Sequence, residues 1–158
     1  MFIKVSIQDT LLIDPEELNG NYGELVDKKI KEKYLLKIID GQGLCVKIAQ
    51  YSSREAKICI GSANLAVEIN LVCLVFSSFE GEILQAQISH QDSTGLVARL
   101  FSLSVFIPGQ NLHPGSYFTE DGQWVWKYDD CQYAFNVGDD VYFKTANVNF
   151  NSRPVNNS

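Results

Sequence analysis

Residues 124–135, WVWKYDDCQYAF, contain both tryptophans of the chain and place a large ring at every second position from Trp124 to Tyr128. Side chains alternate between the two faces of a strand, so in an extended segment these rings share one face. The Asp129-Asp130 pair that follows is typical of a turn. The segment predicts two strands joined by a turn, and its rings face either the core of the protein, a partner protein or a nucleic-acid strand.

Energy alone does not decide what these rings face. Stacking a base on an exposed ring contributes about 1–3 kcal/mol. Burying the same ring against a core or a partner contributes a comparable or larger amount. Exposure must therefore decide. A small barrel has few large side chains to fill it, so we expect at least one of the two tryptophans to be structural.

The second half of the chain consists of short strand patterns separated by turn clusters such as QDSTG, PGQN, HPGS, EDG and VGDD. The predicted strands cover residues 81–90, 95–101, 104–107, 123–127, 132–136 and 141–149. Five or six short strands in about 75 residues, with no helical periodicity, favour a small barrel, with an OB-like barrel as the leading choice.

The first half combines strands with a helix. Alternation over residues 3–7 predicts a half-buried strand. Asp14-Pro15-Glu16-Glu17 has the N-cap, the proline and the first-turn acids that open a helical turn. A stripe of Tyr22, Val26, Ile30 and Tyr34 predicts a longer helix over residues 22–37 with one face towards the core. Further strands are predicted at residues 44–48, 57–60 and 65–76, which gives a β-rich α+β fold.

The long strand over residues 65–76 suggests where two domains meet. Its first part alternates, but from Leu71 to Phe76 it is apolar on both sides, as in strands that are buried on both faces. The predicted domains are residues 1–78 and 79–150. The tail, residues 151–158, has no apolar periodicity and is predicted to be disordered.

Composition is that of a soluble globular protein, with 46% hydrophobic and 20% charged residues. No apolar run is long enough to span a bilayer, and the N-terminus does not have the pattern of a signal peptide, so we expect a protein of the cytosol or nucleus without a membrane partner. Residues 79–158 hold four basic residues against nine acidic ones. Any contact with RNA or DNA should therefore be weak or assisted by another basic surface.

Residues with the chemistry for catalysis or metal binding are few and scattered. The four cysteines are not spaced as a metal or redox motif and are expected to be reduced, small apolar side chains. His90 with Asp92 could form a general-base pair, but a solvated turn is the favoured interpretation. The pairs Asp129-Asp130 and Asp139-Asp140 could share a divalent ion if their turns met, and they also fit ordinary turns. No catalytic or phosphate-binding motif is present, so no catalysis, cofactor or metal is predicted.

Several segments in order resemble one known family. MFIKVSIQDTLLIDPEEL, GLCVKI, LVCLVFSSFEGEIL, VFIPGQNL and WVWKYDD are similar to the larger stalk subunit of DNA-directed RNA polymerases, a family with archaeal as well as eukaryotic members, and the RNA polymerase III member is nearest in pattern. The resemblance covers about residues 1–150. It implies an N-terminal RNP-like α+β tip domain followed by an OB-fold (S1-like) barrel, and a non-catalytic role in the nucleus.

The resemblance also implies partners. Members of the family pair with a small helical stalk partner subunit, dock to the core subunits of RNA polymerase through the tip domain, and act in transcription initiation near the RNA exit path. The turn Asp40, Gly41, Gln42 and Gly43 is then the candidate docking segment. On the barrel, the candidates to face RNA are Trp126, Lys127 and Tyr142, because a base can stack on a ring and a phosphate can pair with a nearby cation.

Family members usually continue past the position of Phe150 with a strand that closes the barrel, so this barrel is expected to be open or closed by a partner segment. Three alternatives stay open. The chain could be the equivalent subunit of RNA polymerase II or of an archaeal-type polymerase. It could be a free-standing OB-fold protein that binds single strands tightly and with strong salt dependence. It could also be a small β-rich enzyme that uses His90 and Asp92.

Overall fold

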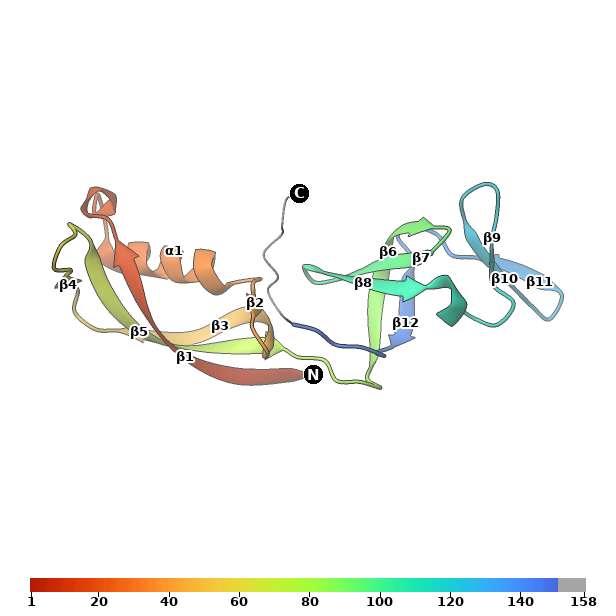
Figure 1. Ribbon diagram of the computed structural model, residues 1–158, viewed down its shortest axis with the longest axis horizontal. Coiled ribbons are helices and arrows are strands. Elements are labelled where there is room, and N and C mark those ends of the chain that lie inside the picture. The colour runs from red at the N-terminus through yellow and green to blue at the C-terminus, as the bar shows by residue number, and fades with distance from the viewer. Residues whose placement is uncertain (151–158) are drawn as a thin grey trace. The chain divides into compact units, whose positions relative to one another are not determined.

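The computed structural model describes residues 1–150, and most of them lie in antiparallel strands (Figure 1). The predicted β-rich α+β class is confirmed. The chain divides into two compact units, one formed by residues 1–79 and 147–150, the other by residues 80–146. The predicted tail, residues 151–158, lies outside the described residues. No helix within residues 1–150 combines the length and apolar character that crossing a membrane would require.

The first unit is an antiparallel sheet with one long helix. Its sheet has the order β1-β5-β3-β2, and a short strand β4 also pairs with β5. The elements are β1 (Phe2–Ile13), the 3₁₀ turn η1 (Pro15–Glu17), α1 (Tyr22–Tyr34), β2 (Ile38–Ile39), β3 (Gly43–Ser53), β4 (Lys57–Ile58) and β5 (Leu65–Phe76).

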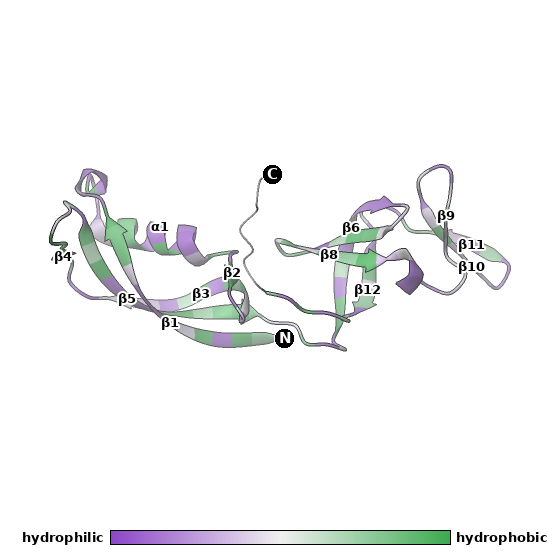
Figure 2. Ribbon diagram, in the orientation of Figure 1, coloured by the Kyte–Doolittle hydropathy of each residue, from purple (hydrophilic) through white to green (hydrophobic). Residues whose placement is uncertain are grey.

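The helix α1 covers one face of this sheet. Val26 and Ile30 of the predicted stripe are fully buried, and they pack against the odd-numbered positions of β1 and β5. The even-numbered positions of β1 are all exposed, and the ribbon coloured by hydropathy shows this alternation along the strand (Figure 2). The buried core residues of β1 and β5 are Leu11, Ile13, Val67, Ile69, Leu71, Cys73 and Val75.

Both predicted helix starts are present. The Asp14 carboxylate accepts a hydrogen bond from the backbone N–H of Glu16 at 3.0 Å, and the Asp14 N–H donates to the Glu17 carboxylate at 3.2 Å, which completes a capping box. The predicted helix end at residue 37 is wrong, because α1 ends at Tyr34. Leu36 lies in the left-handed region (φ +58°), and its N–H donates to the carbonyl of Cys45 at 2.8 Å. This bond turns the chain from the helix into the sheet.

The second unit contains two open sheets. The strands β6 to β8 form a meander with β12 added beside β6, giving the order β12-β6-β7-β8, and a second sheet has the order β11-β10-β9. The elements are β6 (Ile83–Asp92), β7 (Gly95–Leu100), β8 (Leu103–Pro108), η2 (Gly109–Asn111), β9 (Tyr117–Phe118), β10 (Trp124–Tyr128), β11 (Cys131–Ala134) and β12 (Asp140–Lys144).

The last strand is shorter than predicted. Residues 141–149 were expected to be extended, but β12 ends at Lys144, opposite the first residue of β6. Thr145 then pairs with the segment before β6, donating its N–H to the carbonyl of Glu82 at 2.8 Å. Because β12 and β6 run antiparallel and Lys144 pairs with Ile83, the first residue of β6, there is no further residue of β6 with which β12 could pair.

The side-chain amide of Gln91 connects the two sheets of the second unit, and that of Gln123 adds a bond at the end of the β10–β11 hairpin. The Gln91 amide on β6 accepts a hydrogen bond from the Trp124 N–H at 2.9 Å and donates to the carbonyl of Phe135 at 3.0 Å. Gln123 donates to the same carbonyl at 3.1 Å. These bonds satisfy backbone groups where no strand pairing exists, and beneath them Ile88, Leu96 and Trp124 form a shared core.

Candidate functional site

The rings of β10 pass from core to solvent along one face of the strand. Trp124 is 8% exposed, Trp126 is half-buried and Tyr128 is 62% exposed. Trp124 donates its indole N–H to the carbonyl of Asp92 at 2.7 Å, and its ring packs against Phe118 with centroids 5.6 Å apart. The prediction that at least one tryptophan is structural is confirmed.

The ring of Trp124 packs directly against the backbone of Gly109. A Cβ atom at Gly109 would lie 2.4 Å from two carbons of the Trp124 ring. The two segments VFIPGQNL and WVWKYDD therefore meet in space, and the glycine of the first provides the surface on which the first ring of the second lies. This contact is structural and uses none of the candidate binding residues.

The other rings form an exposed group that we call the ring cluster: His113, Trp126, Tyr128 and Tyr133. The Trp126 and Tyr133 rings are stacked at 5.3 Å with an interplanar angle of 24°. The His113 ring lies 6.3 Å from both the Trp126 and the Tyr128 rings. Phe135, at 4.4 Å from the Trp126 ring, connects the cluster to the core.

The three predicted RNA-facing residues lie on three different surfaces. Trp126 belongs to the ring cluster. Lys127 is the next residue of the same strand, so its side chain points to the opposite face of that sheet. Tyr142 is 74% exposed on β12, in the other sheet. Period-2 spacing alone could separate Trp126 from Lys127, but the place of Tyr142 depends on a strand pairing that the sequence does not display.

Two cations that the sequence analysis did not select share the face of Tyr142. Cross-strand register pairs Tyr142 with Gln85 and Lys144 with Ile83, and it pairs Gln87 with Arg99 on the next strand. Paired residues and residues two apart lie on the same side of a sheet. Asp140 pairs with Gln87 and adds one acidic side chain to the same side. We call this set the Tyr142 face: Ile83, Gln85, Gln87, Arg99, Asp140, Tyr142 and Lys144. All seven side chains are exposed.

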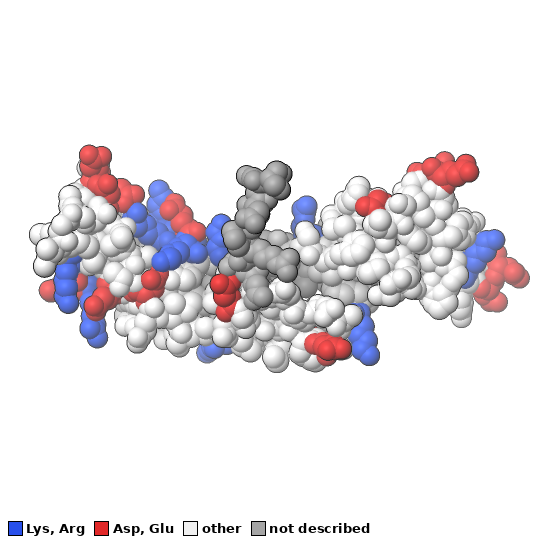
Figure 3. Space-filling model, in the orientation of Figure 1, with Lys and Arg blue, Asp and Glu red and all other residues white. Residues whose placement is uncertain are grey.

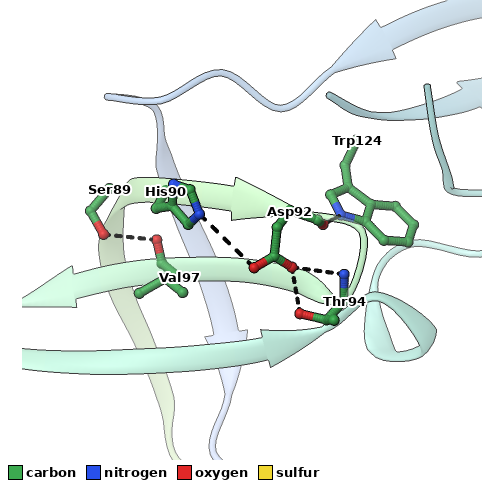
Figure 4. Close-up of polar contacts among 6 residues, drawn as sticks. All are labelled: Ser89, His90, Asp92, Thr94, Val97 and Trp124. Carbon is green, nitrogen blue, oxygen red and sulfur yellow. Dashed lines mark hydrogen bonds and ion pairs between the residues drawn. The ribbon is translucent and has the colours of Figure 1, made fainter. Parts of the chain in front are cut away.

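The His90 and Asp92 pair lies on an exposed hairpin end (Figure 4). The imidazole Nε2 is 3.9 Å from the Asp92 carboxylate, and the two side chains are 67% and 49% exposed, so no cleft encloses them. The Asp92 carboxylate accepts hydrogen bonds from the Thr94 hydroxyl and, at 2.7 Å, from the Thr94 N–H. These bonds lower the pKa of Asp92, with the hydroxyl bond as the largest contribution. The arrangement is that of a turn carboxylate, in line with the solvated-turn interpretation.

Asp129 and Asp130 occupy a turn, whereas Asp139 precedes β12 and Asp140 is the first residue of that strand. Asp129 and Asp130, at φ +49° and +62°, form the two-residue loop between the paired residues Tyr128 and Cys131. The Asp139 carboxylate accepts bonds from the backbone and the side chain of Asn136 at 3.0 and 3.1 Å. Among residues 1–150, no group of three or more His, Cys, Asp or Glu side chains is arranged to hold a metal ion.

The predicted docking turn is partly committed to the fold. Gly43 is buried, and a Cβ atom there would lie 2.1 Å from the carbonyl oxygen of Phe76. The Gly41 N–H donates to the carbonyl of Phe150 at 3.2 Å. Asp40 and Gln42 are exposed. Of these two exposed residues and the two glycines, only Asp40 and Gln42 therefore present side chains at the surface.

The opposite end of the same sheet exposes large apolar side chains. Because β4 pairs with the first residues of β5 and Gly43 adjoins the last, the two ends are a full strand apart. Leu12 is 58% exposed, Ile58 76% and Ile60 fully exposed. We call Ile58 and Ile60 the β4 tip. Leu12 is not part of it, because Leu12 pairs with Ala66 whereas Ile58 pairs with Leu65, which places the two side chains on opposite faces of the sheet. The exposure of the β4 tip was not predicted, because the pattern of residues 57–60 indicates only a short strand.

Cys45 and Cys73 are buried in the first unit, whereas Cys131 is exposed. Burial, together with the hydrogen bond and charge of Cys45, raises the pKa of Cys73 to about 12. Burial also raises the pKa of Cys45. Both thiols therefore stay protonated near neutral pH and act as small apolar side chains, as the sequence analysis predicted for them.

Comparison with known proteins supports the family resemblance. Residues 82–158 match the sequence profile of a family described as RNA polymerase III subunit Rpc25. The matched part contains all the strands of the second unit.

Whole-chain relatives carry the same kind of name. The chain is 28% identical over 149 residues to DNA-directed RNA polymerase III subunit RPC8 of Saccharomyces cerevisiae, covering 91% of this chain and 70% of that protein. It is 27% identical to the Dictyostelium discoideum protein (96% of this chain, 61% of the relative) and 26% identical to the Bos taurus protein (95% and 77%). The predicted resemblance to the larger polymerase stalk subunit, nearest to that of RNA polymerase III, is thereby confirmed.

Proposed function

We propose that this chain is a non-catalytic stalk subunit of RNA polymerase III, acting in transcription initiation near the RNA exit path. The observation that carries the proposal is the match to the polymerase III subunit over residues 82–158 together with relatives that align along the whole chain. The exposed His90 and Asp92 pair offers no enclosed site for a reaction. In this proposal the chain is nuclear and pairs with a small helical partner subunit.

We further propose that the first unit is the RNP-like tip domain and the second an OB-fold (S1-like) barrel. The β6-β7-β8 meander with β12 beside β6 supports a barrel of this kind. The hydrogen bonds of the Gln91 side chain act in place of strand pairing at the junction between β6 and the β9–β11 sheet. The proposed domain limits are residues 1–78 and 79–150.

The β4 tip is the better candidate for docking to polymerase core subunits. Exposed large apolar side chains are typical of protein interaction sites, and Ile58 and Ile60 are two such side chains in one short segment. Asp40–Gly43 offers two polar side chains and uses its glycines for the fold, although Asp40 and Gln42 can still contribute at a second point. Replacing Ile58 and Ile60 with Asp should reduce recovery of polymerase subunits far more than replacing Asp40 and Gln42 with Ala.

The contact with RNA is proposed to be weak and to use the Tyr142 face. There an exposed ring lies in the same sheet face as Arg99 and Lys144, two of the three basic residues among residues 80–146. Trp126 and Lys127 are the other candidates, but each points elsewhere.

Affinity purification of a tagged copy from cells tests the assignment. The large subunits of RNA polymerase III and a small helical subunit should be recovered together. Recovery of the large subunits of RNA polymerase II or of an archaeal-type polymerase would instead support the alternative assignment. Recovery of no polymerase subunit, with the tagged protein folded, would reject the proposal and favour a free-standing binding protein.

A further inference from the structure

The ring cluster is a surface feature that the fold of the second unit does not require. The core of that unit is formed by Ile88, Leu96 and Trp124 with partly buried apolar neighbours, and the four residues of the cluster are not among them. Tyr128 and Tyr133 are 62% and 45% exposed. Aromatic side chains that are left in solvent and supported from below are typical of binding surfaces.

The rings of the cluster pack against one another and against Phe135. The Trp126 ring contacts both the Tyr133 ring and the Phe135 ring, and the His113 Nδ1 lies 2.9 Å from the carbonyl oxygen of Pro114. The His113 ring meets the Tyr128 ring at 87°. A rigid group of rings loses little conformational entropy when a ligand stacks on it.

The charges beside the cluster are negative. Asp129 and Asp130 follow Tyr128 directly, and the tight loop between the paired residues Tyr128 and Cys131 holds both exposed carboxylates at the end of the ring-bearing strands. Figure 3 shows acidic side chains at this hairpin, with a basic side chain beside them, and further acidic side chains at the loop that joins β9 to β10. Residues 80–146 hold three basic residues against nine acidic ones.

This combination discriminates between ligand classes. A nucleic acid stacked on the rings would bring its phosphates towards Asp129 and Asp130, and the nearest cation in sequence, Lys127, points to the opposite face of the sheet. An arginine side chain fits both features, because its planar guanidinium stacks on aromatic rings and forms bidentate bonds with carboxylates.

We propose that the ring cluster and the Asp129-Asp130 hairpin together form a docking site for an arginine-rich segment of a protein partner. Guanidinium groups stack on Tyr128 and Tyr133 and pair with the two carboxylates. The site is separate from the Tyr142 face and goes beyond the function proposed above, because it assigns a second, protein-binding role to the same unit.

The test is the binding of a fluorescent octa-arginine peptide to the full chain, measured by anisotropy at low and at physiological salt. The variants are Tyr128→Ala with Tyr133→Ala, and Asp129→Asn with Asp130→Asn. The matched control is Glu120→Gln with Asp121→Asn, which removes the same charge from the neighbouring loop. Tyr128→Phe with Tyr133→Phe keeps the rings and tests stacking without the hydroxyl groups.

Each of the first two variants should weaken binding about fivefold or more, since each removes stacking or pairing contacts of modest strength. The control and the Phe variant should change the affinity for octa-arginine less than about twofold. Octa-lysine should bind to the unaltered chain more weakly than octa-arginine does. Equal losses in the hairpin variant and the control would show general attraction to an acidic protein and overturn the proposal. Tighter binding of octauridylate, lost in the Tyr→Ala variant, would overturn it in favour of RNA.

The outcome is separable from that of the proposed function. The Tyr128→Ala/Tyr133→Ala variant should still be recovered with polymerase subunits if docking uses the β4 tip. Loss of octa-arginine binding with retained polymerase association supports the inference. Unchanged octa-arginine binding in that folded variant rejects it, whichever polymerase is recovered.

Discussion

Gly109 shows how a single residue without a side chain can determine a packing arrangement. Its backbone conformation is open to any residue, since its φ is not in the left-handed region, and its N–H is bonded to the carbonyl of Thr94 at 2.9 Å. The constraint is the indole of Trp124, which would lie 2.4 Å from a Cβ atom. The ring cannot move away without breaking its bond to the carbonyl of Asp92.

Replacing Gly109 with Ala should therefore lower the free energy of unfolding of the second unit by about 1–3 kcal/mol, the range for an overpacked core. Urea unfolding followed by tryptophan fluorescence measures the change. Gly20→Ala is the control, because nothing lies within 4 Å of a Cβ atom there.

A double-mutant cycle identifies the cause. In a Trp124→Phe background the smaller ring leaves room for the methyl group. There Gly109→Ala should lower the free energy of unfolding clearly less than it does in the presence of Trp124. Equal costs in the two backgrounds would show that the clash with the indole is not responsible.

At the scale of elements, Asp9 connects β1 to the end of α1. Its carboxylate accepts hydrogen bonds from the ammonium of Lys33 and the hydroxyl of Tyr34. Partial burial acts to raise the pKa of Asp9, but the bonds from Lys33, Tyr34 and the Thr10 N–H outweigh it and hold the pKa below its ordinary value of 3.8. Burial and the Asp9 charge raise the pKa of Tyr34, so the phenol remains a donor at every physiological pH.

Because the pKa of Asp9 is lower in the folded than in the unfolded protein, ionised Asp9 stabilises the fold above the unfolded value. That stability is lost as the pH falls through the folded value. Asp9→Asn should lower the free energy of unfolding by about 1 kcal/mol at pH 7, a figure reduced for the half-exposed Lys33. The difference from wild type should shrink at pH 3. Denaturant unfolding at both pH values checks this.

The control for Asp9 is Glu32→Gln, which removes an i,i+4 pair with Lys28 on the surface of α1. Its effect should be below about 0.5 kcal/mol. A loss of stability from Glu32→Gln as large as that from Asp9→Asn, or an Asp9→Asn loss that is equal at pH 7 and pH 3, would contradict the assigned role.

Local patterns predicted the elements better than their limits. Alternation and capping residues predicted β1, η1, the start of α1 and β5, because these features depend on neighbours in sequence. The end of α1 depends on a bond from Leu36 to Cys45, and the end of β12 depends on where β6 begins. The two-residue strand β9 has a pattern too short to detect. The bonds of Gln91 and Gln123 join residues far apart in sequence and leave no local signal.

At the scale of the whole chain, the candidate site was predicted in part. The alternation of rings in residues 124–128 correctly gave a shared face, and the sequence argument that one tryptophan is structural agrees with the burial of Trp124. The cations beside Tyr142 could not be found, because Arg99 joins that face only through the register of β6, β7 and β12. The exposure of the β4 tip likewise depends on tertiary packing.

The distribution of charge predicts the affinity of the chain for RNA and its dependence on salt. On the Tyr142 face, Arg99 and Lys144 are the cations available to phosphates, and the surrounding unit is strongly acidic. Neutralising Z phosphates of a single strand gives a slope of about −0.7Z in a plot of log affinity against log salt concentration, so a slope near about −1.4 is expected for two contacts. Binding of a uridylate 12-mer should be weak, with a dissociation constant of about 10⁻⁴ M, the weak end of nonspecific binding.

Variants separate stacking from charge in this contact. Tyr142→Ala should weaken uridylate binding about tenfold without changing the salt slope, because it removes one stacked base and no cation. Arg99→Ala with Lys144→Ala should flatten the salt slope towards zero. Lys127→Ala, which lies in the β9–β11 sheet and not on the Tyr142 face, should change neither the affinity nor the salt slope. A slope steeper than about −3 would require more phosphate contacts than two cations can make. Such a slope would show that the RNA binds a surface other than the Tyr142 face. Unchanged affinity of the Tyr142→Ala variant for uridylate would show the same.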